Sequence, residues 1–385
     1  MSLALLCAFA SACGGVEPIT SCEPKNNVMP VCMFKNPEDI VALPGSVDTL
    51  VISEFGSMDG SKPGRLVTLE PQFSLAKQLY PLFDSRIGHE SRAGGMAPPS
   101  GPGRDVGVVG AEQWGDPACP GPPGPDFSPH GIDLRVRADG RTQLAVVNHG
   151  GRESVELLEL IVAGVDSSPI WRGCAIAPED GYFNDVVLLG DGGFLVTHMY
   201  PRSSPWKAFL AMFGSDTGWV YEWHANSGFE VVAGTDGAFP NGIEVSHDDT
   251  EIFLNVYGAS EVRRISRETG ETLAVANVSH PDNISWNEAG DRLLVASHTG
   301  SFRQMLGCRS IEEGSCPLPS EVLSLGPETL DKRLLFATEG DPMGAITVAI
   351  ERGEHLWFGT FAGDRIGVFA LRHLQDAPST SPPAP

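Results

Sequence analysis

The chain has 385 residues and a formal net charge of −23 at pH 7, because 49 Asp and Glu residues outnumber 26 Lys and Arg residues. This excess of negative charge argues against nucleic acid and against anionic membrane surfaces as partners, since both require Lys and Arg. It is compatible with a site that collects cations and, equally, with an exported protein whose acidic surface keeps it soluble. Helical periodicity is scarce, and 45 Gly and 31 Pro residues separate many short β-rich runs, which predicts an all-β architecture.

The first residues indicate export. Residues 3–12 are mostly apolar, a run too short to cross a bilayer, and the small residues Ala10, Ser11 and Ala12 precede Cys13 as at a bacterial lipoprotein cleavage site. No Lys or Arg precedes Lys25, so the positive start of a signal peptide is missing, and either the true start lies upstream or the leader is atypical. We expect a leader at residues 1–13 and a lipid anchor on Cys13. The protein would then be periplasmic and anchored to the outer membrane, or extracellular, with no other membrane contact.

Six further cysteines remain after Cys7 and Cys13 are set aside. They are Cys22, Cys32, Cys119, Cys174, Cys308 and Cys316. An even number in an oxidising compartment predicts disulfide bonds. Cys22 with Cys32, and Cys308 with Cys316, are close enough in sequence to be natural pairs. Metal binding by these thiols is the weaker interpretation, because the chain contains no Cys-x-x-Cys pair.

A single β-rich domain is expected over residues 31–372, between a linker at residues 14–30 and a Ser- and Pro-rich disordered tail at residues 373–385. The strongest strand predictions are residues 48–53, 65–69, 143–149, 155–160, 251–256, 292–297, 333–337, 355–360 and 365–370.

Two segments interrupt these strands. Residues 85–128 form a long Gly- and Pro-rich insertion, and such loops are usually functional or disordered. Because it leads directly into His130, a loop that covers a site is one interpretation. Residues 205–213 place Trp206, Phe209, Leu210 and Phe213 on one face of a short helix. That face is expected either to cover a substrate mouth as a lid or, slightly more in keeping with the sequence, to pack between neighbouring sheets.

One short phrase returns six times along the chain. It consists of a polar pair, an Ile or Val that begins a short strand, an acidic or Gly-rich turn, and a β-rich run. Its Ile or Val stands at positions 40, 132, 186, 243, 284 and 346. Each copy has about the length of one propeller blade of four strands. Six copies therefore predict a six-bladed β-propeller.

The polar pairs of this repeat predict a metal-binding tunnel. The innermost strand of every blade begins beside the central channel of a propeller, so equivalent positions point at one axial place. These positions are Glu38-Asp39, His130, Asn184-Asp185, Asn241, Asp282-Asn283 and Gly344-Ala345. Carboxylate and amide oxygens are the hard ligands that Ca²⁺ takes, whereas zinc prefers His or thiolate. Such pairs are also ordinary turn dipeptides, but five in register with the repeat favour a site.

Two histidines stand beside this ring. His130 opens the inner strand of the second copy, and His149 ends the next strand run, so a hairpin would bring the two imidazoles together. A coupled pair of this kind suits a general base that acts on water. A hydrogen-bonded pair with a purely structural role is the alternative.

These motifs closely resemble the paraoxonase/arylesterase family. They occur in the family's order from about residue 36 to 370, as residues 38–40, 128–132, 146–149, 154–160, 183–186, 240–243 and 282–285. The resemblance implies two Ca²⁺ ions in the tunnel of a six-bladed propeller. It implies that a catalytic ion is held by Glu38, Asn184, Asn241, Asp282 and Asn283, and a structural ion by Asp39, Asp185 and the backbone carbonyl of Ile132. It also implies a catalytic dyad of His130 and His149, with His298 as a further active-site histidine.

The resemblance implies hydrolysis of lactones and aryl esters, with organophosphate turnover as a side activity and a small ester or lactone as substrate. The ion would stabilise the oxyanion while His130, polarised by His149, activates water; Asp282 is an alternative base or nucleophile. The chain departs from the family at His198-Met199, where an Asn-Asp pair is usual, and at Ser297, where animal enzymes often have Cys. A gluconolactonase-like sugar-lactone hydrolase and a non-catalytic, calcium-stabilised scaffold for a protein partner remain as rivals.

Overall fold

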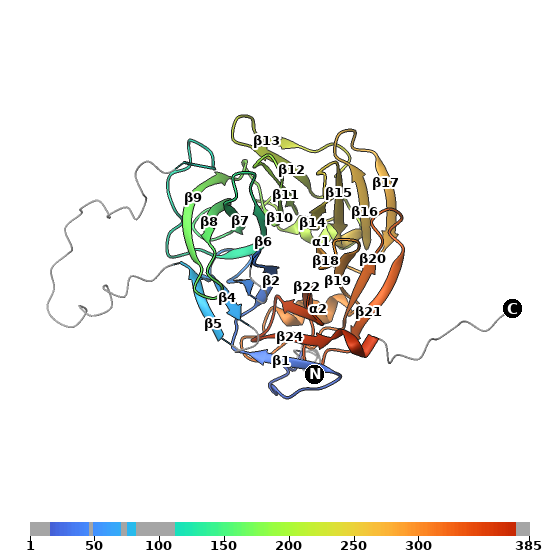
Figure 1. Ribbon diagram of the computed structural model, residues 1–385. Coiled ribbons are helices and arrows are strands. Elements are labelled where there is room, and N and C mark those ends of the chain that lie inside the picture. Colours follow the sequence, from blue (N-terminus) through green and yellow to red (C-terminus); the bar gives the residue numbers. More distant parts are fainter. Residues whose placement is uncertain (1–15, 46–48, 71–74, 82–111, 375–385) are drawn as a thin grey trace, which may run out of the picture.

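The chain folds into a six-bladed β-propeller, which confirms the expected architecture (Figure 1). The computed structural model describes residues 16–45, 49–70, 75–81 and 112–374. The expected leader with Cys13, residues 82–111 of the insertion and residues 375–385 of the tail lie outside the described residues. Six four-stranded antiparallel sheets stand around a central channel, and in each sheet the strand that carries the copy of the repeat is innermost (Figure 1).

Five blades consist of four strands that follow one another in the chain. The first has β2 (Pro37–Ala42), β3 (Leu50–Glu54), β4 (Arg65–Glu70) and β5 (Leu75–Tyr80). The second has β6 (Pro129–Val136), β7 (Thr142–Asn148), β8 (Ser154–Ile161) and β9 (Ser168–Ile176). The third has β10 (Phe183–Leu188), β11 (Phe194–His198), β12 (Trp219–His224) and β13 (Gly228–Val231). The fourth has β14 (Pro240–Val245), β15 (Glu251–Val256), β16 (Glu261–Ser266) and β17 (Thr272–Asn277). The fifth has β18 (Pro281–Trp286), β19 (Leu293–His298), β20 (Ser320–Leu325) and β21 (Lys332–Thr338).

The sixth blade is built from both ends of the chain. Its strands β22 (Ile346–Arg352), β23 (His355–Thr360) and β24 (Arg365–Ala370) are completed by β1 (Val28–Cys32), which pairs with β24 from Val28↔Phe369 to Cys32↔Arg365. The fully buried Arg365 side chain donates hydrogen bonds to the backbone carbonyls of Ser21, Ile19 and Pro342. The segment expected as a linker therefore ends inside a strand, and that strand closes the ring.

The hydrophobic core is divided into wedges, each lying between two neighbouring blades. Leu144 and Val146 of the second blade pack with Val51 and Leu66 of the first, for example. Val187 and Leu195 of the third blade pack with Ile243 in the same way. Strands in the middle of a blade, such as the wholly buried β7, place alternate side chains toward the two adjacent sheets and so make contact on both faces. Burial of this apolar surface holds the six blades in fixed positions around the channel.

Three disulfide bonds join the described cysteines. Cys22–Cys32 and Cys308–Cys316 are the two pairs expected from their spacing, and Cys119–Cys174 is the third. These bonds indicate an oxidising compartment. None of the helices that the structure describes is long and apolar enough to cross a membrane.

The helix expected at residues 205–213 forms, but its apolar face is exposed. Trp206, Phe209 and Phe213, at and just after α1 (Trp206–Ala211), are 60%, 55% and 72% exposed, so the expected packing between sheets is wrong. The second helix, α2 (Phe302–Cys308), begins with a capping box at Ser301. The described end of the insertion, from residue 112, is hydrogen-bonded along β9, the outermost strand of the second blade, at Trp114 and Asp116.

Candidate active site

The polar pairs of the repeat lie at irregularities in the inner strands. The pairing register of β6 with β7 shifts between Pro129 and Ile132, and the corresponding shift precedes the Ile or Val of the repeat in the first, third, fourth and fifth blades. In the sixth blade the shift falls between Ile346 and Ala349. Gly344-Ala345, the position expected there, therefore precedes the inner strand, and the buried Thr347 lies at the irregularity instead. A bulge of this kind re-aims side chains. At Gly131 only glycine fits, because a Cβ atom there would stand 2.6 Å from the carbonyl oxygen of Asn184 in the next blade. The local backbone thus brings adjacent inner strands close together and turns their polar residues into the channel.

The structure brings the predicted ring together. Its members are all buried: Glu38, His130, Asn184, Asn241, Asp282 and Asn283. The Asn283 amide donates to Glu38 Oε1 at 3.1 Å, across the gap between the first and fifth blades. His130 Nε2 lies 3.6 Å from the same oxygen, and Asn241 is hydrogen-bonded to Asp282.

Four oxygen atoms of this ring are buried and have no hydrogen-bond partner among the described residues. They are Glu38 Oε2, Asn184 Oδ1, Asn241 Oδ1 and Asn283 Oδ1. Buried polar atoms are nearly always hydrogen-bonded, and all four of these are acceptors. No cluster of three or more His, Cys, Asp or Glu that could hold a metal occurs in the described ranges; the ring instead mixes two carboxylates with three amides. That donor set fits a hard cation such as Ca²⁺ and does not fit zinc.

The electrostatics of the ring point the same way. Burial raises the pKa of Glu38 well above its usual value, and repulsion from Asp39, Asp282 and Asp185 raises it further. Burial also raises the pKa of Asp282 to about 8, against a hydrogen bond from Asn241 that lowers it. Without a cation, the ring therefore holds acidic groups whose ionised form is disfavoured.

Below the ring, three carboxylates each bridge two adjacent inner strands. Asp39 accepts the backbone N–H groups of Ile40 and Ile132 at 2.8 and 2.7 Å. Asp185 accepts those of Val186 and Ile243 at 2.8 and 2.9 Å. Asp133 repeats the pattern with Leu134 and Leu188, both at 2.7 Å. Each carboxylate therefore fastens its own blade to the next one.

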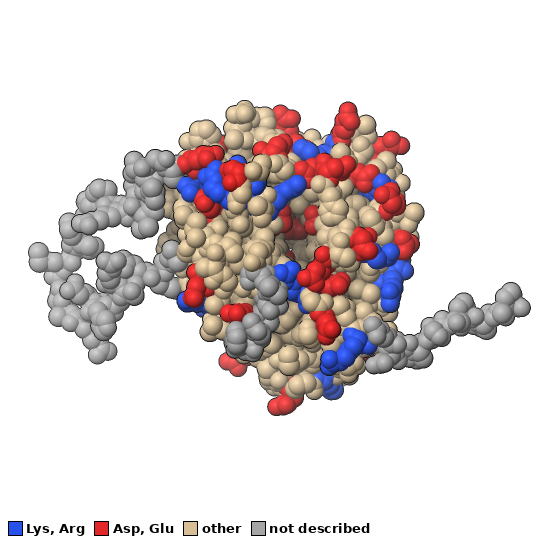
Figure 2. Space-filling view, in the orientation of Figure 1, with Lys and Arg blue, Asp and Glu red and all other residues tan. Residues whose placement is uncertain are grey.

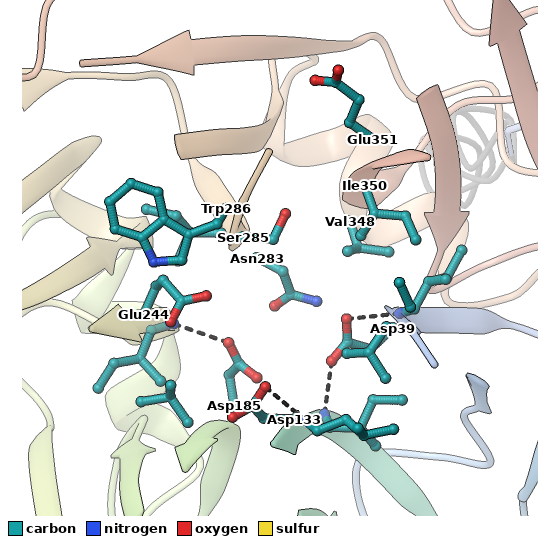
Figure 3. Close-up of a pocket in the computed structure, with 18 of the residues that line it drawn as sticks. Asp39, Asp133, Asp185, Glu244, Asn283, Ser285, Trp286, Val348, Ile350 and Glu351 are labelled. Carbon is teal, nitrogen blue, oxygen red and sulfur yellow. Dashed lines mark hydrogen bonds between the residues drawn. The ribbon is translucent and has the colours of Figure 1, made fainter. Parts of the chain in front are cut away.

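These carboxylates surround a cavity of about 270 Å³ at this end of the channel (Figure 3). Asp39, Asp133, Asp185 and Glu244 line it, and Figure 2 shows a hollow near the middle of the viewed face with acidic side chains beside it. Burial raises the pKa of Asp39 to about 7 and that of Glu244 to about 8. The sequence analysis missed Asp133 and Glu244, although each directly follows the Ile of its repeat.

The two predicted dyad histidines are in contact. His130 Nδ1 lies 2.9 Å from His149 Nε2, and the ring of Phe55 stacks on His130 with 4.7 Å between centroids. Burial, followed by electrostatic repulsion between the two imidazoles when both are protonated, lowers the pKa of His130 well below its usual value. Behind the pair, His149 Nδ1 lies 3.0 Å from both carboxylate oxygens of Glu153, a residue that the sequence analysis did not single out.

His298 lies across the ring from this pair. Its Nδ1 lies 3.0 Å from the hydroxyl of Tyr257, and its buried Nε2 lies 3.7 Å from Asp282 and has no hydrogen-bond partner in the described part of the chain. Burial lowers the pKa of His298 to about 3. At the departure from the family pattern, His198 accepts the backbone N–H of Tyr182, and Met199 Sδ lies 3.5 Å from the Asn184 amide.

An arc of aromatic rings joins the two sides of the channel at the end where the inner strands begin, opposite the acidic cavity. Successive rings contact one another with centroids 5.2 to 5.9 Å apart from His149 to His298, through Tyr182, Tyr200, Phe239 and Tyr257. Phe361 extends the arc beyond His298, at 5.8 Å. Such a wall is suited to apolar acyl and aryl groups. Tyr182 and Phe239 directly precede inner strands, and Tyr257 directly follows β15, which was a usable signal in the sequence.

Comparison with known proteins gives one family and several structural neighbours. A family model described as arylesterase matches residues 119–365, and a search of curated proteins finds no match. A protein of unknown function from Bacteroides thetaiotaomicron has 10% sequence identity and a TM-score of 0.51, with 92% of this chain and 75% of that chain covered. A gluconolactonase from Xanthomonas campestris has 14% identity and a TM-score of 0.47, with 89% of each chain covered. At 10% identity, the Bacteroides thetaiotaomicron structure supports the propeller fold alone.

Proposed function

This chain belongs to the arylesterase family, and from that premise we propose that it is a calcium-dependent hydrolase of carboxylic esters and lactones, with organophosphate turnover as a side activity. The observation that carries the proposal is the group of four unpartnered, buried acceptor oxygens in the ring, directly beside a pair of hydrogen-bonded histidines. Family membership alone supports an ester or lactone hydrolase, and the ring supports the metal.

Two sets of residues would hold calcium. Glu38, Asn184, Asn241, Asp282 and Asn283 would hold the catalytic ion, and Asp39, Asp185 and the carbonyl of Ile132 the structural one. Both sets offer only oxygen atoms, as Ca²⁺ requires. When bound in the ring, the ion supplies a Lewis acid for a carbonyl oxygen and for the negative charge that develops on it.

The remaining chemistry belongs to the side chains of the chain itself. Because His130 is neutral, it has a lone pair with which to take a proton from water, and its Nε2 faces Glu38 in the ring. The aromatic arc limits access of bulk water and favours apolar acyl and aryl groups over the polar ring of a sugar lactone. Asp282, which lies opposite beside His298, is the alternative base or nucleophile.

The test combines metal analysis with an activity panel. Phenyl acetate and simple aliphatic lactones would be offered to calcium-loaded protein and to protein dialysed against EDTA. We expect hydrolysis only with calcium bound. The Asn241→Ala variant should lose both calcium and turnover, whereas Asn226→Ala, which changes an exposed turn residue between β12 and β13, should keep both.

Two results would contradict the proposal in different ways. Hydrolysis that persists in protein shown to be free of metal would remove the role of calcium. Bound calcium with no hydrolysis of any ester or lactone would favour the non-catalytic scaffold.

A further inference from the structure

The carboxylate of Glu153 lies behind the histidine pair and is held there by hydrogen bonds from two other segments. Glu153 lies in the connection between β7 and β8, and its side chain is 8% exposed, next to a wholly buried His149 side chain. Its Oε1 accepts the backbone N–H of Phe183 at 2.8 Å. Its Oε2 accepts Arg202 Nη1 at 2.7 Å. Two segments of the third blade thus hold this carboxylate against His149.

Both of these partners can only donate. A backbone N–H has no lone pair to offer, and a guanidinium carries donors alone. They therefore fix the carboxylate of Glu153 as an acceptor, and its third contact, His149 Nδ1 at 3.0 Å, must bring the hydrogen. We propose that Glu153 is a positioning residue that holds His149 as the Nδ1–H tautomer. The one nitrogen lone pair that the two histidines leave free is then on Nε2 of His130. The inference rests on the proposed hydrolase function and adds the origin of its base.

The consequence follows along the hydrogen bonds. A neutral imidazole has one donor and one acceptor nitrogen, so His149 with a proton on Nδ1 accepts at Nε2. The neighbouring His130 Nδ1, at 2.9 Å, must then donate. The only remaining lone pair is on His130 Nε2, which faces the ring. With the opposite tautomers, His130 would present an N–H to the ring and could take no proton from water.

Glu38 and Glu153, at opposite ends of the histidine pair, favour opposite tautomers. Glu38 at the ring would favour a proton on His130 Nε2, but the distance between them, 3.6 Å, is beyond a hydrogen bond. Glu153 lies within hydrogen-bond distance of His149. Arg202 in turn is held by the carbonyl of Asp59 at 3.1 Å and lies over the ring of Tyr182. The geometry therefore selects the tautomer in which His130 is a base.

The test reads the tautomer directly. Calcium-loaded protein labelled with ¹⁵N-histidine would be examined by NMR, with the His149 signals assigned from their loss in His149→Gln. We expect a proton on His149 Nδ1 and none on His130 Nε2. In Glu153→Gln, which offers an amide donor in place of one acceptor oxygen, that pattern should be lost, and kcat for phenyl acetate should fall at least about tenfold with KM nearly unchanged.

The matched control is Glu222→Gln. Glu222 also binds a histidine and an arginine, His224 and Arg267, but it lies in β12, away from the channel. It should leave kcat unchanged. The inference is overturned if wild-type His149 Nδ1 carries no proton, or if Glu153→Gln and Glu222→Gln have equal kcat. If Glu153→Gln fails to fold, the wild-type spectrum decides alone. If the wild type hydrolyses nothing, the proposed function fails, and the spectrum still reports the tautomer.

Discussion

Replacing Asp282 with asparagine should have opposite effects on stability in the presence and absence of calcium. In metal-free protein, burial raises the pKa of Asp282 from its ordinary value near 3.8 to about 8. The native state therefore holds this proton more tightly than the unfolded state does. The stability that this group contributes is present below pH 4 and is lost as the pH rises toward 8. An asparagine at this position does not titrate, so its contribution to stability would not change with pH in this range.

The expected size follows from the pKa shift. Each pH unit above the unfolded-state pKa costs about 1.4 kcal/mol until the folded-state pKa is reached, because Asp282 must take up a proton when the chain folds. At pH 7 this proton uptake costs on the order of 4 kcal/mol. In EDTA, Asp282→Asn should unfold with a higher free energy than the wild type at pH 7 and with nearly the same free energy at pH 4. In saturating calcium the order should reverse, because the ring loses one of its two carboxylates and the ion stabilises the variant less.

Urea denaturation at pH 4 and pH 7, with calcium and with EDTA, measures these four differences. Asp216→Asn, an exposed loop position, is the control and should change stability by less than about 0.5 kcal/mol in every condition. A variant that is less stable than the wild type in EDTA at pH 7 would refute the reasoning. So would a gain of equal size at pH 4 and pH 7, because the effect could then not come from the carboxylate's ionisation.

Two further changes test how the blades are held together. Arg365→Met removes the buried donor of three backbone carbonyls, which should lower the free energy of unfolding in urea by about 3–5 kcal/mol. The exposed Arg372→Met should have almost no effect. A loss below about 1 kcal/mol at Arg365 would contradict its role in closing the ring. Gly131→Ala introduces a Cβ atom 2.6 Å from the Asn184 carbonyl, so it should cost about 1–3 kcal/mol and weaken calcium binding in calorimetry. Gly124→Ala, which meets open space, should do neither, and unaltered calcium affinity in Gly131→Ala would show that the close approach of the blades does not shape the ring.

The residues of the polar ring were predictable because most of them occupy the same position in successive copies of the repeat. Glu38, Asn184, Asn241 and Asp282 each stand two residues before the Ile or Val of their copy, and a propeller gathers such equivalents around its axis. The same argument, extended by one residue past the Ile, would have found Asp133 and Glu244. The dyad was predictable for a local reason, since a hairpin returns His149 beside His130.

Other parts depend on contacts that no repeat encodes. Glu153 acquires its role from Phe183 and Arg202 of another blade, and only the folded loops reveal it. Strand β1 carries no copy of the phrase, so nothing in its five residues indicated that they complete the last sheet. The apolar face of α1 was assigned to the interior because periodicity reports which residues share a face and not what that face meets.

The shared sixth sheet also sets an order of events. Synthesis delivers β1 before the first blade and β24 after the fifth, so β1 must wait for the rest of the propeller before it finds its partner. Until β1 pairs with β24, the sixth blade is incomplete and the ring of blades is open. Glu38 of the first blade and Asn283 of the fifth then have no fixed separation. Capture of a cation by the finished circle would therefore report that the circle has closed.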